Sequence, residues 1–163
     1  MTEQQIQEKS ITVELDAQEV KLCEYIGKLR SEIARKNNVF DAKIGDHDGT
    51  KADVQGFKAE YAFAKHNNLF PDFGLSPRSG SADGVTRRNS KYDIKSTSYK
   101  TGNLLSTLKI NKDIDVYILA YVNKNKVFFI GWATKDELID KKNIKDLGHG
   151  SGYFLSRHKL HQF

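Results

Sequence analysis

The alternation of apolar and polar residues predicts a strand followed by a long helix near the start of the chain. Residues 11–15, ITVEL, have the period of a half-buried strand, and we expect this strand at an edge of a sheet. Asp16 followed by Glu19 resembles a capping box, and apolar residues then recur every three or four positions. This pattern predicts one amphipathic helix over residues 17–36. Its apolar stripe favours packing on the same domain, although it is also compatible with a dimer seam.

A second amphipathic helix is predicted from Thr50 to about Asn68. Asp53 stands three residues after Thr50, in the position of a capping partner. The apolar positions that recur at helical spacing are Val54, Phe57, Tyr61 and Ala64. Prolines, glycines and serines then indicate a loop, after which the strand-like segments begin.

The second half of the chain has the pattern of a series of strands. The expected strands are residues 82–86, 91–97 and 104–110, the apolar runs IDVYILAYV and VFFIGWA, and the final segment YFLS. The two apolar runs are nearly continuous, so we expect them in the middle of the sheet. Thr134 with Glu137 predicts a short helix that ends near Lys142. Together these elements predict an α/β (α+β) fold with a mixed central β-sheet flanked by helices.

Length and composition indicate one domain over residues 1–163. A second core would leave each half of the chain near the lower size limit of stable domains. The single cysteine cannot form an internal disulfide, which favours a reducing compartment. No apolar run approaches the length of a membrane span, and the first residues, MTEQQIQEKS, lack the apolar stretch of a secretory signal. We therefore expect a soluble, cytoplasmic protein with no membrane partner.

The net charge of +5 is concentrated in one part of the chain. Residues 76–100 carry six basic side chains against Asp83 and Asp93, a net charge of +4. The basic residues are Arg78, Arg87, Arg88, Lys91, Lys95 and Lys100. Such a segment would attract a polyanion such as nucleic acid, and the alternative is an ordinary solvated basic face.

The segment KYDIKST carries the first candidate chemistry. On a strand, Asp93 and Lys95 would share one face, while the apolar residues between them face the other way. Asp83 stands ten residues earlier, on the preceding expected strand. A hairpin loop over residues 87–89, with Asn89 in the left-handed conformation, would place Asp83 directly opposite Asp93. Two facing carboxylates repel each other, and a divalent cation between them would remove that cost.

Glu60 is the third candidate acid. On the second helix it lies about 60° from Phe57 around the helix axis, so its carboxylate borders the packing face. Burial of a carboxylate costs free energy unless a partner offsets it. We expect this partner to be Lys95, a backbone donor or a metal ion.

These residues together resemble a known nuclease pattern. GFKAEYAFAKHNNLF, SADG and YDIKST resemble the helix-Glu, Asp and D/ExK elements of the PD-(D/E)xK nuclease superfamily, in its compact phage or bacterial form. The resemblance covers residues 51–133. It implies a restriction-endonuclease-like catalytic core there, with residues 1–50 as an N-terminal strand and helix extension and residues 134–163 as a C-terminal helix and strand.

The sequence departs from that pattern in two respects. The literal Pro-Asp dipeptide ends at Asp72, whereas Asp83 follows an alanine. We prefer Asp83 because it fits the hairpin and Asp72 lies in a loop rich in proline and glycine; Asp72 is the second choice. The superfamily core usually has αβββαβ order, and residues 98–113 have the pattern of either an extra strand or a loop, which leaves the topology open.

The resemblance implies phosphodiester hydrolysis with Mg²⁺, for which Mn²⁺ is a possible substitute. The metal ligands would be Asp83, Asp93 and the carbonyl of Ile94, because hard cations prefer oxygen ligands. Lys95 would orient or deprotonate the attacking water, or stabilise charge on the phosphate. Glu60 would bind a second metal ion or hold metal-bound waters.

The expected substrate is DNA, and the expected activity is that of an endonuclease. The expected DNA contacts are Arg78, Arg87, Arg88, Lys91, Ser96 and Lys100. Paired cuts on both strands would favour a homodimer. No nucleotide-binding loop or nucleophile triad is present, so a nucleotide cofactor is not expected. The alternative is a catalytically inactive DNA-binding or interaction protein that retains the nuclease fold.

Overall fold

A computed structural model of the 163-residue chain describes residues 2, 5–6, 10–38, 48–75, 81–109 and 113–163. Its helices are α2 (Ala17–Lys36), α3 (Gly49–His66) and α4 (Lys135–Leu138), with 3₁₀ turns η1 (Lys141–Asn143) and η2 (Arg157–Lys159). Its strands are β1 (Ile11–Glu14), β2 (Gly84–Val85), β3 (Lys91–Thr97), β4 (Leu104–Thr107), β5 (Val116–Asn123), β6 (Lys126–Thr134), β7 (Ile144–Asp146) and β8 (Ser151–Leu155).

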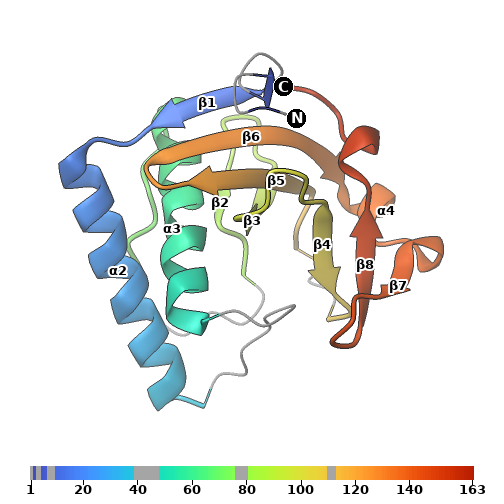
Figure 1. The fold of residues 1–163 in the computed structure, drawn as a ribbon, viewed down its shortest axis with the longest axis horizontal. Coiled ribbons are helices and arrows are strands. Elements are labelled where there is room, and N and C mark those ends of the chain that lie inside the picture. Colours follow the sequence, from blue (N-terminus) through green and yellow to red (C-terminus); the bar gives the residue numbers. More distant parts are fainter. Residues whose placement is uncertain (1, 3–4, 7–9, 39–47, 76–80, 110–112) are drawn as a thin grey trace.

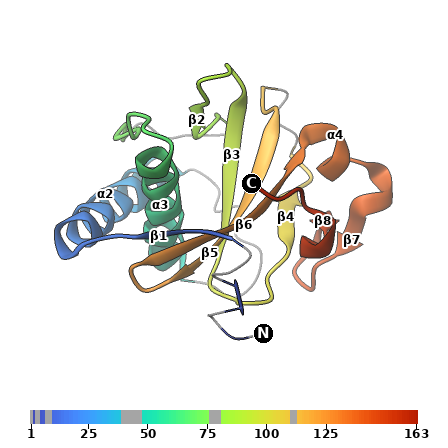
Figure 2. The ribbon, with the colours of Figure 1, turned by 90° about the horizontal axis from the view of Figure 1, so that it is seen from above.

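The predicted mixed α/β fold is confirmed. Five strands form a curled main sheet in the order β1-β6-β5-β3-β2, in which β3 and β5 are parallel and the other neighbours antiparallel. Helices α2 and α3 cover one face of this sheet, while a second sheet, β4-β8-β7, lies with α4 on the other side (Figures 1 and 2). As expected, β1 is an edge strand, and β5 and β6 occupy the middle.

Strand β5 is buried on both faces, as its continuous apolar run predicts. Alternate side chains belong to two separate cores. Those on the helix side are Ile118, Ala120 and Val122. Those on the side of the second sheet are Tyr117, Leu119 and Tyr121. Even-numbered residues of β5 therefore face the helices, and odd-numbered residues face the opposite way. The same rule holds for β3, its parallel neighbour.

The helix starts depend on acidic caps. Asp16 and Glu19 form the predicted capping box at α2, with the Asp16 carboxylate accepting the backbone N–H of Glu19 at 2.8 Å. At α3 the predicted pair of Thr50 and Asp53 is wrong. The helix begins at Gly49, one residue earlier than expected. The Thr50 amide therefore lies in the first turn, where it has no acceptor within the helix, and it donates to the Asp48 carboxylate at 3.0 Å.

No helix in the described segments is both long and apolar enough to cross a membrane.

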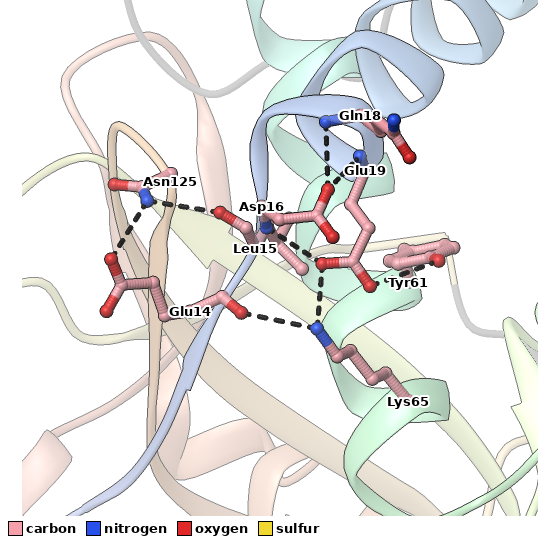
Figure 3. Close-up of polar contacts among 8 residues, drawn as sticks. All are labelled: Glu14, Leu15, Asp16, Gln18, Glu19, Tyr61, Lys65 and Asn125. Carbon is pink, nitrogen blue, oxygen red and sulfur yellow. Dashed lines mark hydrogen bonds and ion pairs between the residues drawn. The ribbon is translucent and has the colours of Figure 1, made fainter.

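Polar contacts fix α3 against the junction between β1 and α2 (Figure 3). The Lys65 ammonium donates to the Glu19 carboxylate at 2.7 Å and to the Glu14 carbonyl at 3.3 Å. Asn125, in the turn between β5 and β6, donates to the Leu15 carbonyl at 3.1 Å. These bonds join both helices to the sheet and thereby set the position of α3.

The C-terminal half differs from the expected topology. Strand β4 leaves the main sheet and pairs with β8, and the predicted strand over residues 104–110 is shorter, with residue 110 outside the described part. A two-residue turn with Lys124 at a φ of 55° joins β5 directly to β6, so no helix separates them as αβββαβ order would require. Helix α4 ends at Leu138, and Asp140 then caps the separate turn η1 by accepting the Lys142 N–H.

Candidate functional site

The hairpin of β2 and β3 forms as the sequence predicts. Gly84 pairs with Tyr92, and residues 87–89 form a three-residue loop because the Thr86 N–H donates to the Ser90 carbonyl at 2.9 Å. Asn89 has a φ of 63°, in the left-handed region. The loop chemistry of the sequence is therefore sufficient to set the register of this hairpin.

Asp83 does not simply face Asp93, because the ladder of β2 ends at Gly84. The Asp83 backbone N–H donates to the Tyr92 carbonyl at 2.9 Å, while the Asp83 carboxylate accepts the N–H of Ile94 at 2.6 Å. Asp83 thus spans the position opposite Asp93 and points its carboxylate along the edge of β3. The side chain takes the role that a backbone carbonyl of a longer β2 would have.

The Asp83 carboxyl is enclosed by protein, although the residue as a whole keeps some exposure. Burial raises the pKa of this carboxyl well above its usual range, and the nearby charges of Glu60 and Asp93 raise it further. The Ile94 amide and the Lys95 ammonium act in the opposite direction. The charges of the other three predicted catalytic residues therefore all act on the Asp83 carboxyl.

Asp93 and Lys95 lie on the face of β3 that points away from α3. Their side chains form an ion pair of 2.8 Å, with 18% and 37% exposure. The strand neighbour of Asp93 is Tyr117, a buried core residue. Burial, and next the charge of Asp93, raise the pKa of Tyr117 to about 12. Asp93 therefore stands between an apolar wall and an ammonium group.

Glu60 approaches the same edge from α3. Its carboxylate forms an ion pair of 2.8 Å with Arg30 of α2, and the two side chains are 18% and 15% exposed. The Arg30 guanidinium also donates to the carbonyls of Gly74 at 3.1 Å and Asp72 at 2.5 Å, and it lies 4.5 Å from the centre of the Phe57 ring. Arg30 is thus held by several contacts and in turn holds Glu60 near the cluster.

Arg30 is a site residue that the sequence reasoning did not identify. A signal was present, because Arg30 follows Ile26 by four residues and precedes Ile33 by three, on the packing face of α2. A basic side chain on such a face requires an acceptor. Which acceptor it meets depends on the packing of α2 against α3.

These groups meet at the edge of the main sheet, where β2 is only two residues long. Beyond Gly84 the edge of β3 has no backbone partner from β2. In a strand the N–H and C=O of one residue point to the same side. Because the Ile94 N–H points to Asp83, the Ile94 carbonyl lies on the same edge. The Ile94 carbonyl is therefore a fourth oxygen ligand candidate, on the same edge as the Asp83 carboxylate.

The donor set suits a hard cation, since it consists of carboxylates and a backbone carbonyl. Ionisation of the enclosed Asp83 carboxyl is unfavourable because of burial and the charges of Glu60 and Asp93. A bound cation would offset this free-energy cost. Across the described residues, however, no three acidic, histidine or cysteine side chains form a ready metal cage. In the structure the Glu60 carboxylate pairs with Arg30, and the Asp93 carboxylate pairs with Lys95. A bound cation would have to replace these protein counter-ions.

Asp72, the second choice for the aspartate, is not among the charges that act most strongly on the Asp83 carboxyl. It is exposed, and its carboxylate accepts the N–H of Gly74 at 2.8 Å, within its own loop. The backbone of Asp72 contributes instead through its carbonyl, which holds Arg30. The geometry therefore favours Asp83.

The basic residues of the hairpin lie at its exposed end. Arg87, Arg88 and Lys91 are exposed, and Arg87 makes one long contact of 3.5 Å with the Asn68 carbonyl. With about 3.3 Å per residue, the loop lies roughly 15 Å along the hairpin from the acids. Lys100 is exposed beyond the end of β3.

Another predicted DNA contact, Ser96, is not brought to the cluster. Ser96 has the parity of the helix-facing side chains, so it points away from Lys95, and its hydroxyl accepts from Gln55 at 3.1 Å. A residue two positions before or after Lys95 would have shared its face. Arg78 lies outside the described residues.

The structure thus brings Glu60, Asp83, Asp93 and Lys95 to one edge of the main sheet, with Arg30 as a further member. Function is inferred from these residues and their geometry. A scan of the sequence against protein-family models finds no match, and searches among curated proteins and among solved structures find none either.

Proposed function

We propose that this protein is a Mg²⁺-dependent nuclease that hydrolyses phosphodiester bonds of DNA. The observation that carries the proposal is the enclosed Asp83 carboxyl, which accepts the N–H of Ile94 and whose pKa is raised by burial and by the charges of Glu60 and Asp93. A carboxyl in this setting lowers the stability of the fold, and such a cost is typical of functional sites. The resemblance to the PD-(D/E)xK superfamily involves the same residues.

The proposed roles follow from the chemistry of each group. When bound, Mg²⁺ supplies the positive charge that attack of water on a phosphodiester requires. Asp83, Asp93 and the Ile94 carbonyl would hold this ion. Lys95 is close enough to Asp93 to orient or deprotonate the attacking water, or to stabilise charge on the phosphate. Glu60 would bind a second ion or its waters after it releases Arg30.

DNA is the proposed substrate because the exposed basic residues Arg87, Arg88 and Lys91 continue the same hairpin that carries the acids. A duplex lying along this hairpin would place one phosphate at the acids and others near the loop. Endonucleolytic cleavage fits a cluster at an open sheet edge. A homodimer would supply the second cut of a duplex.

A second candidate is a DNA-binding or interaction protein that keeps this fold without cleavage. The observation that favours it is the pairing of two of the acids with basic side chains, Glu60 with Arg30 and Asp93 with Lys95. Such pairs satisfy the acids without any metal ion. In that case the basic hairpin would retain its affinity for DNA.

Cleavage assays with the purified protein test both candidates. Supercoiled plasmid, linear duplex, branched junctions and single strands are incubated with Mg²⁺, Mn²⁺ or EDTA. We expect cleavage with Mg²⁺ and none with EDTA. Asp93→Asn and Lys95→Ala should each lower the rate by about 100-fold or more. Their thermal transitions should remain, because both side chains are outside the apolar cores.

Glu32→Gln is the matched control, since Glu32 is an exposed acid of α2 away from the cluster. It should cleave at the wild-type rate. DNA binding without cleavage of any substrate in Mg²⁺ would support the second candidate. Cleavage that survives both Asp93→Asn and Lys95→Ala would place the active site elsewhere.

A further inference from the structure

A cavity of about 360 Å³, open to the surface, lies between α2, α3 and the end of β5. Figure 1 shows the two helices side by side next to the main sheet. None of the residues that line this cavity belongs to the acidic cluster. The cavity therefore requires its own explanation.

Four lysines and one acid surround the cavity, a net charge of +3. The lysines are Lys28, Lys51, Lys58 and Lys124, and the acid is Glu24. Like charges around one cavity repel each other, so gathering them costs free energy in the absence of an anion. This charge distribution predicts an anionic ligand.

The single charge of Glu24 does not neutralise the four lysines around the cavity. Its carboxylate lies 3.9 Å from the ammonium of Lys58, which also donates to the backbone carbonyl of Lys124 at 3.3 Å. The Lys58 side chain as a whole is 13% exposed and lies at the wall of the cavity. Lys28, Lys51 and the side chain of Lys124 form no ion pair within the described part of the chain. Among the described residues, these three ammonium groups therefore have no acidic partner.

The rest of the lining suits a polyvalent anion with an apolar body beside it. Thr50 and Lys51 come from the first turn of α3, an 18-residue helix whose N-terminal end adds positive potential on this side. Val54 and Val122 add an apolar part of the wall. The close approach of α2 and α3 depends on Gly27, where a Cβ would lie 2.6 Å from the Cα of Val54. The cavity is thus built by the packing of the two helices.

We propose that this lysine pocket binds a phosphate-bearing anion, either a free oligophosphate or a terminal phosphate of a nucleic acid strand. Phosphate matches the pocket better than a single carboxylate because it carries about two negative charges, and because lysines bind it as point charges from several directions. The volume is at the lower end of ligand sites, which suits one or a few phosphate groups. The proposal does not depend on nuclease activity.

Binding is measured on the full chain at 150 mM salt with EDTA, so that the acidic cluster takes no part. Tripolyphosphate is titrated calorimetrically, and a short single strand with a 5′-phosphate is compared with the same strand ending in a 5′-hydroxyl. The pocket variant is Lys28→Gln with Lys51→Gln. The control is Lys141→Gln with Lys159→Gln, two exposed lysines near the second sheet that carry the same change in charge.

We expect the pocket variant to weaken binding of tripolyphosphate by about tenfold or more, and the control by less than about twofold. If the terminal phosphate of a strand is the ligand, the 5′-phosphorylated strand binds more tightly than its 5′-hydroxyl form and the pocket variant removes the difference. If a free oligophosphate is the ligand, only tripolyphosphate responds to the pocket variant. Absence of binding by the wild-type chain, or equal losses in pocket and control variants, would overturn the proposal.

Discussion

Replacing Asp83 by Asn is expected to stabilise the metal-free protein while it removes function. The Asp83 carboxyl is enclosed beside Glu60 and Asp93, and its pKa is raised well above the usual range. Asn has nearly the same shape and keeps an oxygen that can accept the Ile94 N–H. The substitution therefore removes the unfavourable charge with little change in packing.

The size of the effect follows from linkage between protonation and folding. Each unit by which the folded pKa exceeds that of the unfolded chain costs about 1.4 kcal/mol of stability at pH values above the folded pKa. The hydrogen bond from the Ile94 amide becomes weaker when the acceptor loses its charge, and this reduces the gain in stability by about 1 kcal/mol. Because the pKa is raised well above its usual range, we expect the first effect to outweigh the second, so Asp83→Asn should have a higher Tm than the wild-type protein.

The pH dependence distinguishes this mechanism from a general effect on packing. A carboxyl whose pKa is raised on folding binds its proton more strongly in the folded state, so stability falls as pH rises from the unfolded pKa to the folded pKa. Thermal melts in EDTA should show a larger gain for Asp83→Asn at pH 8 than at acidic pH. Near pH 4 the Asp83 carboxyl of the wild-type protein is largely protonated in its folded state, and the gain should become small.

In the presence of Mg²⁺ the wild-type protein should become more stable than Asp83→Asn. An ion bound only to the folded wild-type protein stabilises it by about 2.7 kcal/mol at 100 times its Kd, and Asp83→Asn should lack most of this gain. Glu32→Gln is the control and should alter neither the melt nor its response to Mg²⁺. A loss of stability for Asp83→Asn at pH 8 in EDTA would refute the reasoning, because it would mean that the charged carboxylate is favourable in the fold.

Three further predictions concern other parts of the molecule. Gly84→Ala should destabilise the fold by about 1–3 kcal/mol by urea unfolding, because the added Cβ would lie 2.3 Å from a cross-strand tyrosine hydroxyl; an unchanged midpoint would contradict the close packing of the hairpin. Replacing Arg87 and Arg88 by Ala should weaken DNA binding to all sequences alike and reduce the log–log salt slope by about 0.9 per lost phosphate contact, whereas an unchanged slope would make the loop an ordinary solvated turn. Cys23 is fully buried and burial raises the pKa of its thiol to about 12, so Ellman's reagent should react only after denaturation; rapid reaction of the native protein would contradict this burial.

Local patterns were sufficient for the elements that depend on neighbouring residues. The helix over residues 17–36 and its capping box follow from apolar period and cap chemistry, and both are present as predicted. The hairpin loop follows from the ability of Asn89 to adopt a positive φ. The two apolar runs of β5 and β6 follow from length and hydrophobicity. In each case the determining interactions lie within a few residues of one another.

Two predictions differ from the structure because the sequence offered a second local signal of similar strength. The start of α3 was expected at Thr50, but Asp48 is an equally good cap two positions earlier, and the helix begins at Gly49. Ser96 was expected beside Lys95, although the period of two along β3 already assigns these neighbours to opposite faces. The sequence contained both signals, and the choice between them depended on fine spacing.

Other features depend on contacts between distant segments. The pairing of β4 with β8 rather than with the main sheet joins residues about 50 positions apart, and nothing in either short strand specifies its partner. The amino-acid sequence by itself determined which residue types stand at Asp83, Asp93 and Lys95 and on which face of a strand two of them lie. Only the tertiary structure decided that Arg30 holds Glu60 and that the Asp83 carboxylate turns to Ile94. The physical reason is that periodicity assigns a side chain to a face, whereas the partner it meets there depends on how separate elements pack.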